Sequence, residues 1–239
     1  MRTTTLLLAM LFAAPALADW DDYDYREERE LTLATAGITS FEIEAGAGSL
    51  AIAGVDGARS IDVTATVLVE GAQGDKAASF VEQRMVLTLE RDGDRARLVA
   101  DFWDGLSFGK RGAIALDIRM PEGIDLYIDD GSGSMEVADT GAAVAIDDGS
   151  GSITIANSGD VSIDDGSGSI NVSDVTGNVN IDDGSGSMTL ERISGDVVID
   201  DGSGSINVTD IGGDFTVIDG GSGSINHSAV AGQVDLPED

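Results

Sequence analysis

The chain has 239 residues, a formal charge of −31 and no cysteine. The missing cysteines exclude disulfides, thiolate metal sites and a cysteine nucleophile. So acidic a surface repels nucleic acid and anionic lipid, which excludes nucleic-acid binding and indicates cations or a basic, polymeric surface ligand as partners.

The first 18 residues have the composition of a secretory signal peptide. Arg2 supplies a positive start, Leu6–Ala14 is an apolar run, and Ala16-Leu17-Ala18 gives the small-x-small pattern of a cleavage site. The apolar run is too short to span a bilayer. We therefore expect an exported protein, periplasmic, cell-surface or secreted, whose mature chain starts at Asp19 and has no transmembrane segment.

Residues 19–40 form an acidic N-terminal segment, and residues 41–127 are predicted to be a β-rich cap. Within the cap, residues 43–57 are one degenerate copy of a repeat found downstream. Alternation of apolar and polar residues predicts several longer strands, and one stretch favours a short helix. The expected strands are Ile61–Val67, Met85–Glu90, Ala96–Ala100 and Ala113–Met120, and the expected helix is Lys76–Arg84. Such a cap would cover the first edge of the downstream sheets.

Residues 128–239 carry the repeat that decides the fold. Gly-Ser-Gly-Ser begins at positions 131, 149, 166, 184, 202 and 221, at spacings of 17 to 19 residues. Each unit holds two short strands with inward apolar pairs such as Ile170/Val172 and Val179/Ile181, and glycines at both corners would supply the positive φ of tight bends. One unit cannot bury its apolar face alone, so the units must stack. The sequence predicts an all-β protein, a β-solenoid of about 18-residue two-strand coils with an N-terminal cap, present as a monomer or an edge-associated oligomer.

The order of these motifs resembles a bacterial family. An exported leader is followed by Gly46-Ala-Gly-Ser-Leu50-Ala-Ile52, by a strand that ends in Met120-Pro121, and by the Gly-Ser-Gly-Ser coils. This order is similar to the β-strand-repeat proteins called "putative adhesins". The resemblance covers about residues 40 to 239. It implies the solenoid fold and export, and it implies no catalytic residues.

Paired aspartates precede almost every Gly-Ser-Gly-Ser. They are Asp129/Asp130, Asp147/Asp148, Asp164/Asp165, Asp182/Asp183 and Asp200/Asp201, with Asp219 alone in the last coil. Stacked coils place equivalent side chains about 4.8 Å apart. Two carboxylates at that distance repel by about 0.9 kcal/mol even in bulk water. Some interaction must offset this repulsion along the columns.

Two explanations of the paired aspartates are open. In the first, the second Asp of each pair accepts hydrogen bonds from the following Gly and Ser backbone, and the first Asp points outward into water. In the second, Ca²⁺ lies between coils and is held by the carboxylates, Ser hydroxyls and Gly carbonyls. Here, however, Asp precedes the glycines, whereas in calcium-binding β-rolls it follows them. Ca²⁺ is the one possible cofactor that the sequence suggests.

Catalysis is not expected. His227 is the only histidine and occupies an inward position of the last coil, and a zinc site or a Ser-His-Asp triad needs more groups. Asp139-Thr140-Gly141-Ala142 resembles an aspartic-protease segment, but the same corner recurs in other coils without it.

Three binding functions follow as hypotheses. The leading one is a structural or adhesin-like module at the surface or in the periplasm. The alternatives are a calcium-dependent binding protein that uses the Asp ladders, and an ice- or polysaccharide-binding face on the outward Ser, Thr and Asn column of the first strand of each unit.

Overall fold

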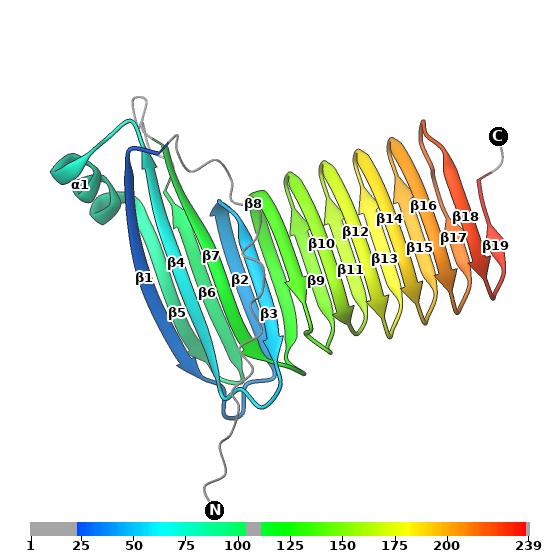
Figure 1. Cartoon of the computed structure of the whole chain (residues 1–239), viewed down its shortest axis with the longest axis horizontal. Coiled ribbons are helices and arrows are strands. Elements are labelled where there is room, and N and C mark those ends of the chain that lie inside the picture. The colour runs from blue at the N-terminus through cyan, green and yellow to red at the C-terminus, as the bar shows by residue number, and fades with distance from the viewer. Residues whose placement is uncertain (1–22, 104–110, 238–239) are drawn as a thin grey trace, which may run out of the picture.

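The computed structural model describes residues 23–103 and 111–237, so the predicted signal peptide lies outside the described residues. The chain forms two facing β-sheets that run the length of an elongated body (Figure 1). The prediction of an all-β solenoid with stacked parallel coils about 18 residues apart is confirmed. Within the described part of the chain, no helix is long and apolar enough to cross a membrane.

The N-terminal part contains longer strands and a helix. These elements are β1 (Tyr25–Ala34), β2 (Ser40–Ala47), β3 (Leu50–Val55), β4 (Ser60–Glu70), α1 (Gly74–Arg84), β5 (Met85–Asp92), β6 (Arg95–Phe102) and β7 (Arg111–Pro121). All four expected strands and the expected helix are present, each with ends shifted by a few residues. Strand β1 lies within the acidic segment 19–40 and pairs antiparallel with β4.

The solenoid consists of short strands in chain order. They are β8 (Asp125–Ala138), β9 (Val144–Asp148), β10 (Gly151–Ser158), β11 (Val161–Asp165), β12 (Gly168–Val175), β13 (Val179–Asp183), β14 (Gly186–Ile193), β15 (Val197–Asp201), β16 (Gly204–Ile211), β17 (Phe215–Val217), β18 (Ile225–Val230) and β19 (Val234–Asp235). Each strand pairs in parallel with the equivalent strand of the next coil, for example Ile163 with Ile181. Strand β8 is long because it runs through the corner and belongs to both sheets.

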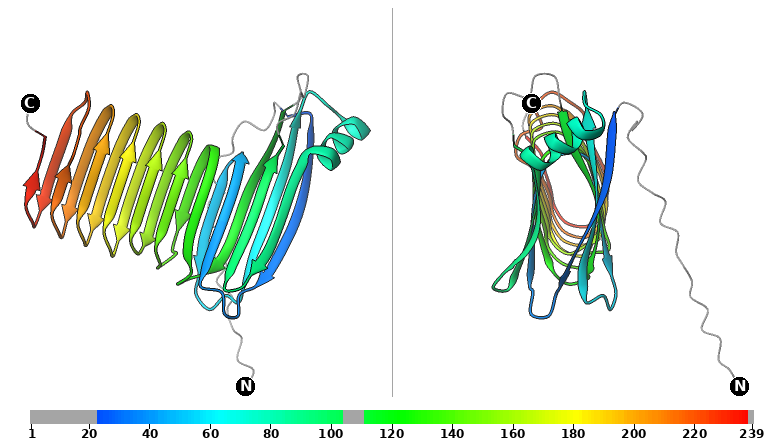
Figure 2. Two further views of the ribbon diagram at one scale, coloured as in Figure 1. Left: turned by 180° about the vertical axis from the view of Figure 1, so that it is seen from behind. Right: turned by 90° about the vertical axis from the view of Figure 1, so that its left-hand side faces the viewer.

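One sheet, here called sheet A, has the order β1-β4-β7-β3-β8-β10-β12-β14-β16-β18. The other, sheet B, has the order β5-β6-β2-β8-β9-β11-β13-β15-β17-β19. Viewed along the long axis, the coils superpose into a flattened tube (Figure 2). The degenerate repeat forms a true coil, because Ile43 pairs with Ile128 and Leu50 with Met135.

The core is the space between the two sheets, filled by one apolar column per inward position. Ile153, Ile170 and Ile206 are fully buried in sheet A, and Val197 and Ile199 are fully buried in sheet B. Period-two alternation therefore assigned the inward and outward faces correctly. These columns make the coils mutually dependent, because each side chain is covered by its equivalents above and below.

The glycines act differently at the two corners. At the Gly-Ser-Gly corner, Gly168 has φ +155°, and a Cβ there would lie 1.5 Å from the carbonyl oxygen of Gly151 in the preceding coil. At the other corner, Asn157 and Asp174 take the positive φ, at 56° and 58°. The expectation that the later glycine supplies it holds at Gly141, with φ 59°, and is wrong for Gly159, Gly177 and Gly195. Gly195 is required instead because a Cβ would lie 2.5 Å from the carbonyl oxygen of Gly177.

Substitution of one inward and one outward residue of β12 tests this packing. Ile170→Asp buries an unpaired charge among fully covered side chains and should lower the free energy of unfolding by several kcal/mol. Asn171→Asp, on the exposed face, should cost less than about 1 kcal/mol. Urea unfolding midpoints of the two variants measure the difference, and equal losses would contradict the assigned faces.

Candidate functional site

The two aspartates of each pair lie on opposite faces of sheet B. The first Asp points outward, and the second is buried at 3 % exposure or less in all five coils from Asp130 to Asp201. The pairs therefore form two separate columns. We call Asp129, Asp147, Asp164, Asp182 and Asp200 the outer row, and Asp130, Asp148, Asp165, Asp183 and Asp201 the inner column.

The inner column has the turn chemistry that the first explanation predicted. The backbone N–H of Ser167 donates to Asp165 Oδ1 at 3.0 Å, and that of Ser203 donates to Asp201 Oδ1 at 3.0 Å. Equivalent bonds reach Asp148 and Asp183. In the last coil, Asp219 accepts from the N–H of Gly221 at 2.8 Å, but its side chain is exposed. Asp148, Asp165, Asp183 and Asp201 thus fix the bends that follow them.

The second oxygen of each inner carboxyl has no such partner. Oδ2 of all five inner aspartates is buried without a hydrogen bond within the described structure. Burial, together with the neighbouring carboxyl of Asp148, raises the pKa of Asp130 to about 7. Burial and the flanking Asp165 and Asp201 raise the pKa of Asp183 to about 6. The pKa values of the other three are raised as well, first by burial.

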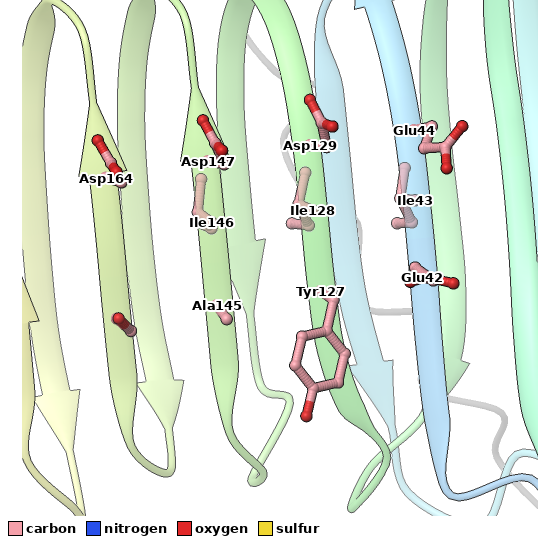
Figure 3. Close-up of a pocket in the computed structure, with 11 residues that line it drawn as sticks. Glu42, Ile43, Glu44, Tyr127, Ile128, Asp129, Ala145, Ile146, Asp147 and Asp164 are labelled. Atoms are coloured by element: carbon pink, nitrogen blue, oxygen red, sulfur yellow. The ribbon is translucent and has the colours of Figure 1, made fainter.

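The outer row lines a shallow groove on sheet B beside the cap (Figure 3). Asp129, Asp147 and Asp164 follow one another across β8, β9 and β11, and Tyr127 lies next to them on β8 with 48 % of its surface exposed. Strand β2 adds Glu42 and Glu44 to the same groove. The sequence pattern does not indicate that Tyr127, Glu42 and Glu44 share a groove, because only the pairing of β2 with β8 brings them together.

Two arginines lie beside the cap end of the groove and pair with its glutamates. Arg95 pairs with Glu42 at 2.9 Å, and Arg97 pairs with Glu44. Both arginines are on β6, which borders β2. In contrast, none of the five outer-row carboxylates forms an ion pair with any residue that the structure describes. The groove therefore passes from a neutralised end to a row of uncompensated negative charge.

The geometry of a metal site is not present in either column. Within residues 23–103 and 111–237, no three His, Cys, Asp or Glu side chains lie close enough together to hold one ion. The two aspartates of a pair cannot share an ion because the sheet separates them. The calcium hypothesis stays a prediction from the sequence, and we assign neither column as a set of metal ligands.

The other residues considered from the sequence occupy structural positions. His227 pairs with Val208 in the ladder, as expected, and its ring centroid lies 6.0 Å from that of Phe215. Asp139 adopts φ 58° at a corner and accepts a hydrogen bond from the Asn157 amide at 2.8 Å. On the outer face of sheet A, the amide of Asn226 donates to Asn207 Oδ1 at 3.1 Å. Two side chains of the polar column suggested for ice or sugar binding are therefore hydrogen-bonded to each other.

Comparison with known proteins gives similarity in solved structures only. No model of a protein family matches the chain, and no curated protein does. One similar structure is a "putative adhesin" from Bacteroides fragilis, 13 % identical, covering 90 % of this chain and 99 % of that one at a TM-score of 0.42.

Two further similar structures have comparable coverage. A "putative cell adhesion protein" from Clostridium sporogenes is 13 % identical, covers 89 % of this chain and 99 % of that one, and has a TM-score of 0.36. A "putative lipid binding protein" from Parabacteroides distasonis is 14 % identical, with 87 % and 96 % covered and a TM-score of 0.36. Two of the three names agree with the resemblance indicated by the sequence motifs, and at this level of similarity they support no statement about function.

Removal of charge from the outer row should stabilise the protein at low salt. In the triple variant Asp164→Asn, Asp182→Asn, Asp200→Asn, three contacts of about 0.9 kcal/mol disappear, so the gain is at most about 2.7 kcal/mol. Screening should remove most of this gain in high NaCl. Thermal midpoints of both proteins in a NaCl series measure the effect.

The same experiment tests the calcium hypothesis. In NaCl, MgCl₂ and CaCl₂ of equal ionic strength, screening alone predicts similar midpoints for the unmodified protein. A specific site would give a larger increase in CaCl₂ that a chelator reverses.

Proposed function

We propose that this protein is an exported binding module, periplasmic or at the cell surface, that holds a cationic chain in the sheet B groove. The ligand class is a Lys- or Arg-rich extended segment of a peptide or surface polymer. The proposal is for a binding role rather than a catalytic one. The observation that carries it is the uncompensated outer row, which continues from Tyr127 along the solenoid.

The spacing and shape of the row suit a linear ligand. Five carboxylates at about 4.8 Å extend over about 19 Å. An extended chain places side chains of one face about 6.6 Å apart, so about three basic side chains would lie along the row. Because the rows on adjacent strands are in register, the site is a line of charge rather than a single pocket.

Tyr127 supplies the second element of recognition. It lies on the same face of sheet B as Asp129, two residues earlier on β8, and its exposed ring points away from the Asp129 carboxylate, near Glu42 of β2 (Figure 3). An ammonium or guanidinium group over an aromatic face gains about 0.5–1 kcal/mol at an exposed site. One basic side chain over the ring and the next one at Asp129 would use both elements, whereas at the cap end of the groove Glu42 and Glu44 are already paired with Arg95 and Arg97. The ligand would therefore start at Tyr127 and extend toward the C-terminus.

Binding of a short fluorescent oligolysine peptide to the protein tests this proposal. The double variant Asp147→Asn, Asp164→Asn should bind about two- to thirty-fold more weakly, at about 0.2–1 kcal/mol per exposed charge. Tyr127→Ala should weaken binding by about two- to five-fold. Fluorescence anisotropy at low salt measures the dissociation constants.

A matched control separates the groove from the general negative field. Asp117→Asn, Glu136→Gln removes the same charge from the exposed face of sheet A. If this variant loses as much affinity as the groove variant, attraction is unspecific and the groove is not the binding site. An oligoglutamate peptide should not bind to any of the proteins.

A further inference from the structure

We propose that the inner column is a proton-binding site, in which the folded protein holds protons at a pH where free aspartate is ionised. The five carboxyls stand at the same corner of successive coils and pair in register, Asp130 with Asp148, Asp148 with Asp165, Asp165 with Asp183, and Asp183 with Asp201. This inference is independent of the groove on the opposite face of the sheet.

The orphaned oxygens carry the argument. Each inner carboxyl has one oxygen, Oδ2, that is buried and lacks a hydrogen bond among the described residues, although the residue as a whole is 0–3 % exposed. The other oxygen is occupied by the bend, as at Asp165 and Asp201. An ionised carboxylate in this position would leave a charged oxygen out of water and without a donor. A buried charge of this kind costs far more than a buried neutral group, so it is neutralised instead.

Among residues 23–103 and 111–237, no basic group acts on the column. The groups that act on each inner Asp are other carboxyls: its neighbours in the column, the outer Asp of its own pair, and Asp219 beyond Asp201. On the cap side the column begins next to Ala45 of β2, which has no charge. No metal-binding group of three acidic or histidine side chains is present in the described chain. A proton can neutralise each inner carboxyl, because it needs neither a cavity nor further ligands.

The sign of the pH dependence follows from proton uptake. The pKa of Asp130 is raised to about 7 and that of Asp183 to about 6, and the other three are raised from 3.8. The folded chain therefore binds more protons than the unfolded chain. For Asp183 and Asp130, the associated stability is fully present below about pH 4 and is lost as the pH rises through about 6 and about 7, respectively. The column makes the solenoid more stable in mild acid than in mild alkali.

The first experiment uses the unmodified protein. Infrared spectra between pH 4 and pH 9 should show the C=O stretch of protonated carboxyl in the folded protein at pH 6. The contributions of Asp183 and Asp130 should disappear with midpoints near 6 and 7, and the band should be absent at pH 6 after unfolding in denaturant. A folded protein without protonated carboxyl at pH 6 would overturn the proposal.

The second experiment compares two variants on the same strands. Asp148→Asn, Asp165→Asn, Asp183→Asn changes three inner residues, and Asp147→Asn, Asp164→Asn, Asp182→Asn changes the three outer residues beside them. The inner variant should lose the part of the band at pH 6 that comes from these three carboxyls, keep the part from Asp130 and Asp201, and show a smaller fall in thermal midpoint between pH 5 and pH 8. In 0.5 M NaCl the Debye length is shorter than the strand spacing, so loss of the outer charges should have little effect on the inner column. The outer variant should therefore keep both the infrared band and the fall in thermal midpoint.

Two results would contradict the assignment. Equal loss of the band in the inner and outer variants would place the protons elsewhere. Binding of Ca²⁺ to the folded protein at pH 8 that is lost in the inner variant, with no protonated carboxyl in the native state at pH 6, would show that a metal neutralises the column. If the inner variant does not fold, the infrared titration of the unmodified protein still decides the question.

Discussion

In-register parallel stacking is the constraint on which the rest of this structure depends. Each coil lies one strand spacing, about 4.8 Å, from the next, so every side chain meets its own equivalent. For apolar residues this is favourable, because Ile163 and Ile181 cover each other in a continuous core. For backbone contacts it leaves no space at the corners, which is why a Cβ at Gly168 would overlap the carbonyl of Gly151.

For charged residues the same register is unfavourable, and the two columns avoid the cost in different ways. The outer row faces water, where repulsion is reduced by solvent and salt and where a cationic ligand can reach it. The inner column is buried, so neither solvent and salt nor a cationic ligand can reduce the repulsion there. We infer that the outer row serves binding and that the inner column is neutralised by protons, while one oxygen of the carboxyls from Asp148 to Asp201 fixes the bend.

The cap makes the two ends of the solenoid different in structure and in charge. It continues both sheets beyond the degenerate coil, through β6 and β5 in sheet B and through β7, β4 and β1 in sheet A (Figure 1). Its arginines neutralise the acidic residues of β2 at one end of the groove. Negative charge therefore accumulates away from the cap, and a bound cationic chain would be oriented along the solenoid axis.

The sequence by itself determined the repeat, the strands within it and the faces of those strands. These follow from local periodicity, because a period of two fixes which residues point inward once one of them, such as Ile170, is buried. It also predicted the turn bonds of the second Asp in each pair, since these join residues two apart, as from Ser167 to Asp165. The sequence also identified the coil at residues 43–57, whose residues match the repeat only approximately.

Only the tertiary structure decided the features that depend on contacts between coils. The place of positive φ at the second corner was mispredicted because Gly195 is needed for its closeness to Gly177, which no local pattern records. The groove at Tyr127 depends on β2 pairing with β8 across the whole cap. The orphaned Oδ2 atoms of the inner column are likewise a property of the closed tube, because burial and the absence of a donor appear only when both sheets and the neighbouring coils are in place.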